Sequence, residues 1–282
     1  MIRPASAQSP AALITRAIPA SGEPLPAVGL GTAEVFDTDD AATRQSACAV
    51  IQALVDNGGT LIDTASTYGD VEQVIGDVTA PAGLRDKLFI ATKLEAPDGD
   101  ELKRSLQRLR TTKVDVLQLH NVSDPQQSLA AFKQWKAQGL CRYIGITSTY
   151  RGAFPAVEAV LAREKPDFVQ IDYSIDDREA EKRILPLAAD KGAAVLTAAP
   201  FWPRALIPRR ARQGNSRLGF RIRRELGAIF SQISAWRPAG DRGDPRQRQW
   251  RPHGRQSRRH ARCASDRRRA AANGAVHWGA LA

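Results

Sequence analysis

The chain has 282 residues, and 43% of them are hydrophobic, which is enough to bury a sizeable core in one large domain or two small ones. Its net charge of +11 is concentrated in residues 202–282, which carry 20 arginines, no lysine and four acidic residues, so the first 201 residues have a net charge of −5. Three widely separated cysteines without a CxxC pair exclude a disulfide framework and a cysteine zinc site, and no stretch approaches the roughly 18 apolar residues of a membrane span.

Residues 1–12 are rich in Ala, Ser and Pro, and we expect them to form a disordered lead. They lack the apolar core of a signal peptide, which predicts a cytoplasmic protein. The same composition is also typical of the last residues of a signal peptide, so a true start further upstream would make the protein exported. After this lead, short apolar runs broken by Ser21, Gly22 and prolines predict a small hairpin.

Seven short strands are predicted to alternate with helices between residues 27 and 199. Each strand is a continuous apolar run, as expected where a parallel sheet is buried on both faces. The helices, the first of them from Ala41 to about Val55, repeat apolar residues every three or four positions. The strands are expected at Ala27–Leu30, Thr60–Asp63, Leu88–Thr92, Val114–Leu119, Tyr143–Thr147, Phe168–Tyr173 and Ala194–Ala199. Such repeated units predict an α/β fold, either a doubly wound sheet or a (β/α)8 TIM barrel that an eighth strand would close.

Four polar residues lie at or just beyond the ends of these strands: Asp63, Tyr68, Lys93 and His120. Each alone has an ordinary explanation, since a strand-end Asp is usually a cap, a loop Tyr a surface contact, a Lys a solvated charge and a His a half-buried imidazole. In a strand–helix barrel, however, the carboxyl ends of the strands meet at one rim, where reactive groups gather. We therefore expect the four side chains to converge.

These four residue types together suit the reduction of a carbonyl group. A carbonyl that accepts hydride becomes an alkoxide and needs a proton, which a Tyr hydroxyl can supply. Because an unperturbed phenol has a pKa of about 10, a neighbouring Lys ammonium is expected to lower that pKa. A carboxylate then holds the Lys in place, and a neutral imidazole donates a hydrogen bond to the carbonyl oxygen.

Several motifs in chain order resemble the aldo/keto reductase family: GLGT, IDTASTYGDVEQVIG, FIATKL, VDVLQLHN, IGIT and DFVQIDYS. The resemblance covers roughly residues 14–201 and implies a (β/α)8 barrel that binds NADP(H). It implies a catalytic tetrad of Asp63, Tyr68, Lys93 and His120, in which the Tyr is the proton donor. It also implies cofactor contacts from Gly31, Thr32, Asp63, Thr147, Ser148 and Gln170. Of these, Thr147 and Ser148 stand where the family usually has a Ser-Asn pair for the carboxamide.

The sequence departs from the family pattern in two places. Many members stack a Tyr on the nicotinamide at the end of strand seven, where this chain has Ala198. Strand eight and the loop after it, which in this family bind the adenosine 2′-phosphate of NADPH, have no counterpart. Without them the first and seventh strands are expected to be open edges, which invite aggregation. This exact chain is therefore expected to be unstable and nearly inactive.

Residues 202–282 are an Arg-rich, Lys-free tail that we expect to be disordered. A GC-rich coding sequence gives this composition when it is translated in the wrong frame, and one inserted base near the codons of Phe201 and Trp202 would suffice. The alternative is a genuine basic tail for RNA or anionic surfaces. Its one apolar stretch, LGAIFSQISAW, has helical spacing, which we attribute to chance.

The expected organisation is thus a lead at 1–12, a barrel at 13–201 and a tail at 202–282. The expected activity is NAD(P)H-dependent reduction of an aldehyde or ketone. The expected partner is a small-molecule carbonyl substrate, with no specific nucleic acid and no metal. Two alternatives remain open, namely a non-enzymatic fragment and a cofactor-binding regulatory subunit. The sequence identifies neither the substrate nor the oligomeric state.

Overall fold

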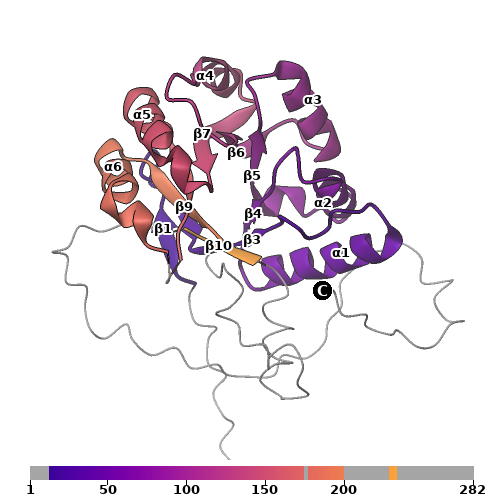
Figure 1. The fold of residues 1–282 in the computed structure, drawn as a ribbon. Helices are drawn as coiled ribbons and strands as arrows, with labels where there is room; N and C mark the ends of the chain where they lie inside the picture. The colour runs from indigo at the N-terminus through magenta and orange to yellow at the C-terminus, as the bar shows by residue number, and fades with distance from the viewer. Residues whose placement is uncertain (1–12, 175–176, 200–228, 234–282) are drawn as a thin grey trace, which may run out of the picture.

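Eight strands form a closed barrel with helices packed around its outside (Figure 1). The computed structural model describes residues 13–174 and 177–199, and of residues 229–233 the backbone. Seven strands run parallel, each beside its neighbour in the sequence. They are β3 (Val28–Gly31), β4 (Leu61–Asp63), β5 (Phe89–Leu94), β6 (Val114–Leu119), β7 (Cys141–Ser148), β8 (Phe168–Asp172) and β9 (Ala194–Ala198). The predicted alternation of strands and helices in a barrel is confirmed.

An α-helix follows each of the strands β3 to β8 and covers the outer face of the barrel (Figure 1). These helices are α1 (Ala41–Asp56), α2 (Val71–Thr79), α3 (Gly99–Arg108), α4 (Ala130–Ala137), α5 (Phe154–Glu164) and α6 (Ile184–Lys191). Helix α1 begins where predicted, because the Asp40 side chain accepts a hydrogen bond of 2.8 Å from the backbone N–H of Thr43. Helix α6 ends at Gly192, whose φ of 69° is in the left-handed region that glycine adopts without strain.

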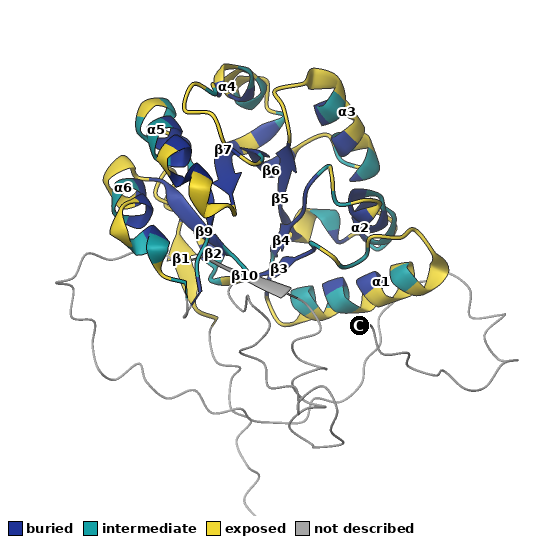
Figure 2. Ribbon diagram, viewed as in Figure 1, coloured by how far each residue is buried: buried dark blue, intermediate teal, exposed yellow. Residues whose placement is uncertain are grey.

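Both faces of the parallel strands are buried (Figure 2). Successive strand residues point to opposite faces, and the core accordingly has two layers. Leu61 and Phe89 belong to an inner cluster, whereas the residues that follow them, Ile62 and Ile90, belong to a larger cluster that includes helix residues. This double burial explains why the strands are continuous apolar runs in the sequence.

A short antiparallel hairpin precedes the barrel, as the sequence predicts. It consists of β1 (Thr15–Ala17) and β2 (Pro24–Pro26). Ile18 and Leu25 are each 2% exposed and belong to the inner core cluster, together with Tyr143 near the start of β7. The hairpin therefore covers the amino-terminal end of the barrel and leaves the opposite end, where the strands finish, for the predicted site.

The eighth place in the barrel is taken by β10 (Ile229–Ile233), which lies antiparallel between β9 and β3. Ser231 pairs with Gly29, and Gln232 pairs with Thr197. The sequence predicted two open edges here, and it missed this strand. The physical reason is that unpaired backbone groups at the two edges need partners. The segment IFSQI, with its two Ile and one Phe, has a high propensity for strand.

No parallel eighth strand is present among the described residues, so the parallel part of the barrel remains incomplete, as predicted. Apart from β10, the lead and the tail lie outside the described residues. The prediction that they are disordered therefore falls on residues that the structure does not describe. Within the described ranges, no helix is long and apolar enough to cross a membrane.

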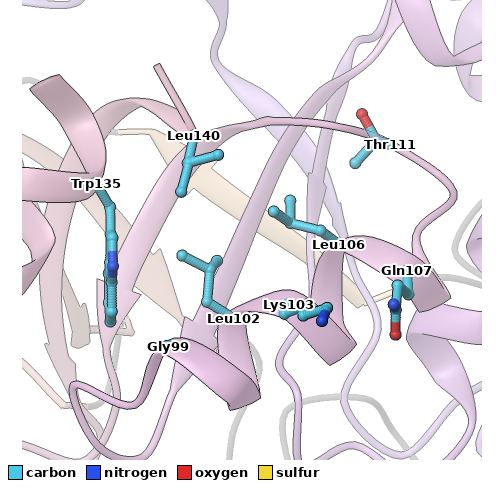
Figure 3. A pocket seen from close by; sticks show the side chains of 8 residues that line it. All are labelled: Gly99, Leu102, Lys103, Leu106, Gln107, Thr111, Trp135 and Leu140. Atoms are coloured by element: carbon cyan, nitrogen blue, oxygen red, sulfur yellow. The ribbon is translucent and has the colours of Figure 1, made fainter. Parts of the chain in front are cut away.

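A groove on the outer surface lies between α3 and α4 (Figure 3). Leu102 and Leu106 of α3 line it together with Trp135 of α4 and with Leu140. Its lining residues come from the helix layer and from the segments that follow these two helices. None of the predicted site residues is among them, so the groove is separate from the site at the strand ends.

Candidate active site

The four predicted reactive residues come together at the carboxyl ends of three neighbouring strands. Asp63 is the last residue of β4, Lys93 is the second to last of β5, and His120 follows β6 directly. Tyr68 lies in the loop between β4 and α2 and packs against the hydrophobic core. Because parallel strands end at the same rim, side chains from all three strands meet there.

Among the described residues, Lys93 is one of the largest fully buried side chains, with an exposure of only 1%. Its Nζ donates hydrogen bonds of 2.9 and 3.0 Å to the two carboxylate oxygens of Asp63 and one of 2.7 Å to the carbonyl oxygen of Thr64. A buried ammonium is costly unless it is paired and hydrogen-bonded. Both conditions are met here, which holds the charge of Lys93 at a defined point under the site.

Tyr68 contacts both of its predicted neighbours. Nζ of Lys93 lies 5.1 Å from the centre of the Tyr68 ring, and the ring packs edge-on against His120 with centroids 6.0 Å apart. Burial raises the pKa of Tyr68, and this outweighs the opposing effect of the Lys93 charge. The expectation that the ammonium would lower this pKa below its ordinary value is therefore wrong for the protein without ligands. The phenol stays protonated at neutral pH, which is the form that can donate a proton.

His120 is held by the backbone and is largely buried. Its N–H donates a hydrogen bond of 2.8 Å to the carbonyl oxygen of Leu94, which fixes the start of the loop after β6. Burial, and then the positive charge of Lys93, lower the pKa of the imidazole. The sequence predicts a neutral imidazole at pH 7, and the lowered pKa agrees with that prediction. Glu95, which the sequence did not single out, lies beside the ring and opposes the shift.

Gln170, predicted as a cofactor contact, is bonded directly to the reactive group of residues. Its Nε2 donates a hydrogen bond of 2.9 Å to Oδ2 of Asp63, and its Oε1 accepts one of 3.0 Å from Nε2 of Gln118. Gln170 on β8 and Asp63 on β4 are 107 residues apart in the chain. The buried amide therefore crosses the barrel and connects its two halves.

The other predicted cofactor residues lie at the same end of the barrel. Thr147 and Ser148 are the last two residues of β7, and Thr147 pairs with Gln170 on β8. Gly31 ends β3, and Thr32 after it donates to the carbonyl oxygen of Asp63 through both its N–H at 3.0 Å and its Oγ1 at 2.8 Å. The predicted cofactor residues other than Asp63 thus lie at or near the carboxyl ends of their strands, at the same end of the barrel as the tetrad.

A second buried carboxylate supports this part of the barrel, and sequence reasoning missed it. Glu72 of α2 is 1% exposed and accepts hydrogen bonds from Ser105, from Oγ1 of Thr92 at 2.6 Å and from Nη2 of Arg108 at 2.7 Å. It therefore joins α2, β5 and α3 below the loop of Tyr68. A helical carboxylate usually faces water, and the sequence held no pattern that would turn this one inward.

The position where the sequence lacks a Tyr is at the end of β9. Ala198 is the last residue of β9 and pairs with Asp172 at the end of β8. Burial raises the pKa of Asp172 to about 6, and its Oδ1 has no hydrogen-bond partner among the described residues. Asp172 is thus one of several residues around the rim that have a buried polar atom without a partner among the described residues.

Comparison with known proteins places these residues in a family context. A family model described as "Aldo/keto reductase family" matches residues 27–215. The chain is 29% identical over 184 residues to the aldo-keto reductase YhdN of Bacillus subtilis, covering 58% of this chain and 54% of that protein. It is 30% identical over 187 residues to methylglyoxal reductase YeaE of Escherichia coli, covering 63% of this chain and 64% of that protein. The chain therefore spans less than two thirds of the length of both relatives.

A solved structure agrees with the family match. The crystal structure of an aldo-keto reductase from Klebsiella pneumoniae in complex with NADPH is similar to this chain, with a TM-score of 0.57 and 27% sequence identity. The similarity covers 69% of this chain and 70% of that one. It extends the resemblance from short motifs to the arrangement of the strands and helices.

Proposed function

Since the chain belongs to the aldo/keto reductase family, we propose that it catalyses the NADPH-dependent reduction of a small aldehyde or ketone to the alcohol. The observation that carries the proposal is the buried Lys93–Asp63 pair beside the ring of Tyr68, with His120 packed edge-on against the same ring. A methylglyoxal reductase among the relatives and an NADPH complex among the similar structures support the same chemistry.

In the proposed reaction, Tyr68 gives its hydroxyl proton to the carbonyl oxygen as the carbonyl carbon is reduced. The reduced nicotinamide, when bound, supplies the hydride. Lys93 stabilises the phenolate that Tyr68 becomes, and Asp63 keeps the ammonium in place. His120 orients the carbonyl by a hydrogen bond to its oxygen. The buried hydrogen bonds of Lys93 to Asp63 and to the carbonyl oxygen of Thr64 support the roles proposed for this pair.

The residues at the ends of β7 and β8 fit the carboxamide end of the cofactor. We propose that Thr147, Ser148 and Gln170 hold it, because hydroxyl and amide groups can both donate to and accept from a carboxamide. Oε1 of Gln118 is buried beside Gln170 and has no partner among the described residues, which leaves one more acceptor there. The residues that would hold the 2′-phosphate are not among those described, and the preference for NADPH rests on the similar structures.

The test is Tyr68→Phe in the full chain. Removal of one hydroxyl should lower the rate of aldehyde reduction by about 10²–10⁴-fold and leave the affinity for NADPH, measured by quenching of Trp fluorescence, nearly unchanged. Tyr143→Phe is the matched control, because it also removes a phenol hydroxyl but lies where the hairpin covers the barrel. Near wild-type reduction by Tyr68→Phe would exclude Tyr68 as the acid.

The wild-type chain itself separates the two remaining alternatives. A chain that binds NADPH and reduces no reactive aldehyde would be the cofactor-binding regulatory subunit. A chain that does neither would be a non-enzymatic fragment, in line with the prediction that residues 202–282 are translated out of frame. Both outcomes would exclude the proposed reductase activity for this chain.

A further inference from the structure

Glu95 occupies a position beside the reactive residues that neither the sequence motifs nor the family resemblance assigns. It is the first residue after β5, and Oε1 of its carboxylate lies 2.5 Å from Nδ1 of His120. The same carboxylate accepts long hydrogen bonds from Oγ1 of Thr67 at 3.3 Å and from Nδ2 of Asn121 at 3.2 Å. Glu95 thus connects the loop of Tyr68 with the loop that begins at His120.

The separation of 2.5 Å determines where a proton must lie. Nδ1 of His120 is buried and has no hydrogen-bond partner among the described residues, so its contact with Glu95 is a close ion pair whose geometry is not that of a regular hydrogen bond. Two atoms that both present lone pairs repel each other at this distance, whereas a protonated ring is attracted to the carboxylate. The close approach is therefore favourable only when the imidazole carries a proton on Nδ1.

We propose that Glu95 is a positioning residue that holds a proton on Nδ1 of His120 and so determines what Nε2 presents to the carbonyl substrate. This inference rests on the proposed reductase function and deepens it. With Nδ1 protonated, a neutral imidazole has only a lone pair at Nε2 and cannot donate to a carbonyl oxygen. Donation from Nε2 therefore requires the imidazolium, whose positive charge Glu95 compensates, and not the neutral imidazole that the sequence predicted.

The charges that face His120 give this arrangement a pH dependence. Burial and Lys93 on β5 lower the pKa of the imidazole, whereas Glu95 and, more weakly, Asp63 on β4 raise it. The Tyr68 ring packs against the imidazole from the remaining side and is uncharged at neutral pH. Reduction should therefore become faster as the pH falls through the imidazole pKa, and loss of the Glu95 charge should move that transition to lower pH.

A purely structural role for Glu95 is the alternative that the experiment must separate. The side chain is 42% exposed and could serve only to connect two loops through Thr67 and Asn121. Glu95→Gln keeps the size of the side chain and an oxygen acceptor for both loop contacts but removes the charge. Asp98→Asn is the matched control, because this exposed acid in the same loop lies outside the contact with His120.

The first measurement is the ¹⁵N NMR spectrum of the imidazole nitrogens in the full chain, with His120→Asn used to assign the signal among the four histidines. Wild type and Asp98→Asn should show the protonated nitrogen at Nδ1, and in Glu95→Gln the signals of the doubly protonated ring should appear only at a lower pH. Because this spectrum needs no turnover, it tests the proton position even if the chain reduces no carbonyl. Unchanged ring signals in Glu95→Gln would overturn the inference.

The second measurement is kcat/KM for aldehyde reduction as a function of pH. The limb of the profile that reports His120 should move to lower pH in Glu95→Gln, because the imidazole loses its neighbouring negative charge, and Glu95→Asp should restore most of the shift. Asp98→Asn should follow wild type. A rate that falls equally at every pH in Glu95→Gln would mean that Glu95 is only a structural contact, and would overturn the positioning role.

Discussion

The wall of the barrel that carries the reactive residues and the part that closes it are built differently. In the wall, β4, β5 and β6 are parallel, and every residue of these three strands is buried. The charges there are compensated, since Lys93 is bonded to Asp63 and Glu72 to Arg108. In the closing part, β9 and β3 are joined by the antiparallel β10, which shares only two residue pairs with β9.

This contrast indicates that the wall and the closing part have different roles in the barrel. The wall satisfies its own charges and can hold the reactive side chains without a ligand. In the closing part, β10 pairs with the edges of β9 and β3. A carboxylate oxygen of Asp172 beside it has no partner among the described residues. We therefore expect substitutions in the wall to cost more stability than substitutions near the closure.

The largest effect is expected from Glu72→Ala. The change removes a buried carboxylate and leaves the Arg108 guanidinium and the hydroxyls of Thr92 and Ser105 without their acceptor. Removing one partner of a buried ion pair costs about 3–5 kcal/mol of the free energy of unfolding. Urea unfolding followed by far-UV circular dichroism measures this cost.

The control is Glu179→Ala, which removes a surface acid that pairs with Lys182 across a single short turn. Exposed pairs of this kind contribute about 0–1 kcal/mol, so the control should unfold close to wild type. Equal stability of Glu72→Ala and the control would mean that the wall does not depend on its buried charges.

A smaller effect is expected from Ser231→Pro in β10. Proline has no N–H, so the barrel loses one backbone hydrogen bond of the closing strand. The loss of that bond, together with the carbonyl group it leaves unpaired, should cost about 1–3 kcal/mol. Ser231→Ala keeps the N–H and is the control in the same unfolding experiment. If both variants unfold like wild type, β10 contributes nothing to the stability of the barrel.

The sequence predicted the wall better than the closure for a physical reason. Asp63, Lys93 and His120 end apolar runs in a regular strand–helix pattern, so their convergence follows from the topology of a parallel barrel. β10 depends instead on a long-range pairing of residues 229–233 with two strand edges, and the strand propensity of IFSQI alone is too weak a signal to predict that pairing. Its apolar residues even have helical spacing, which shows how weak a local signal is when the strand's partners are far away in sequence.

The sequence also could not predict how the side chains bury, hydrogen-bond and interact through their charges. The pKa of Tyr68 was expected to fall because of Lys93, but how deeply a ring is buried is set by tertiary packing, and burial dominates. The inward direction of Glu72 and the approach of Glu95 to His120 likewise depend on the relative positions of neighbouring helices and loops. Residue types and spacing indicate which groups meet at a rim, but not which of their effects prevails.

A third prediction concerns the pH dependence of stability and tests the carboxylate of Asp172 at the end of β8. Burial raises the pKa of Asp172 from 3.8 to about 6, so the folded state holds this proton more tightly than the unfolded state. The stability that the proton contributes is fully present below about pH 4 and is lost as the pH rises through about 6. Asp172→Asn should remove this decline and be more stable than wild type at pH 7 by about 1 kcal/mol, a value reduced for solvent screening of a half-exposed group.

Urea unfolding of wild type and Asp172→Asn at several pH values between 4 and 7.5 measures this difference. The two proteins should have similar stabilities at pH 4 and diverge as the pH rises. Parallel curves over the whole range would show that Asp172 has an ordinary pKa.

The smallest expected effect concerns the charge of the substrate and uses the loops above the wall. The four loops that follow β3, β4, β5 and β6 contain eight acidic residues and no Lys or Arg. These acids are Glu34, Asp37, Asp39, Asp40, Asp70, Glu95, Asp98 and Asp124. Arg44 on α1 pairs with Asp39 and Arg104 on α3 pairs with Asp98, and both partly offset the charge. A substrate that approaches Tyr68 and His120 therefore passes a negative rim, which should disfavour anionic carbonyl compounds.

The magnitude follows from Coulomb's law. Two unit charges about 8 Å apart in water interact by about 0.5 kcal/mol, or roughly twofold in a rate, so several acids together should disfavour an anion by about 3–10-fold. Benzaldehyde should accordingly have a higher kcat/KM than 4-carboxybenzaldehyde by this factor at low salt. Because the Debye length falls from about 10 Å at 0.1 M salt to about 3 Å at 1 M, the preference should shrink as salt is added.

The double variant Asp37→Asn, Asp124→Asn should reduce this preference for the neutral aldehyde at low salt without changing the rate for benzaldehyde. If the preference changes neither with salt nor with these substitutions, it must come from the shape of the pocket. The rim charges would then play no part in selecting the substrate.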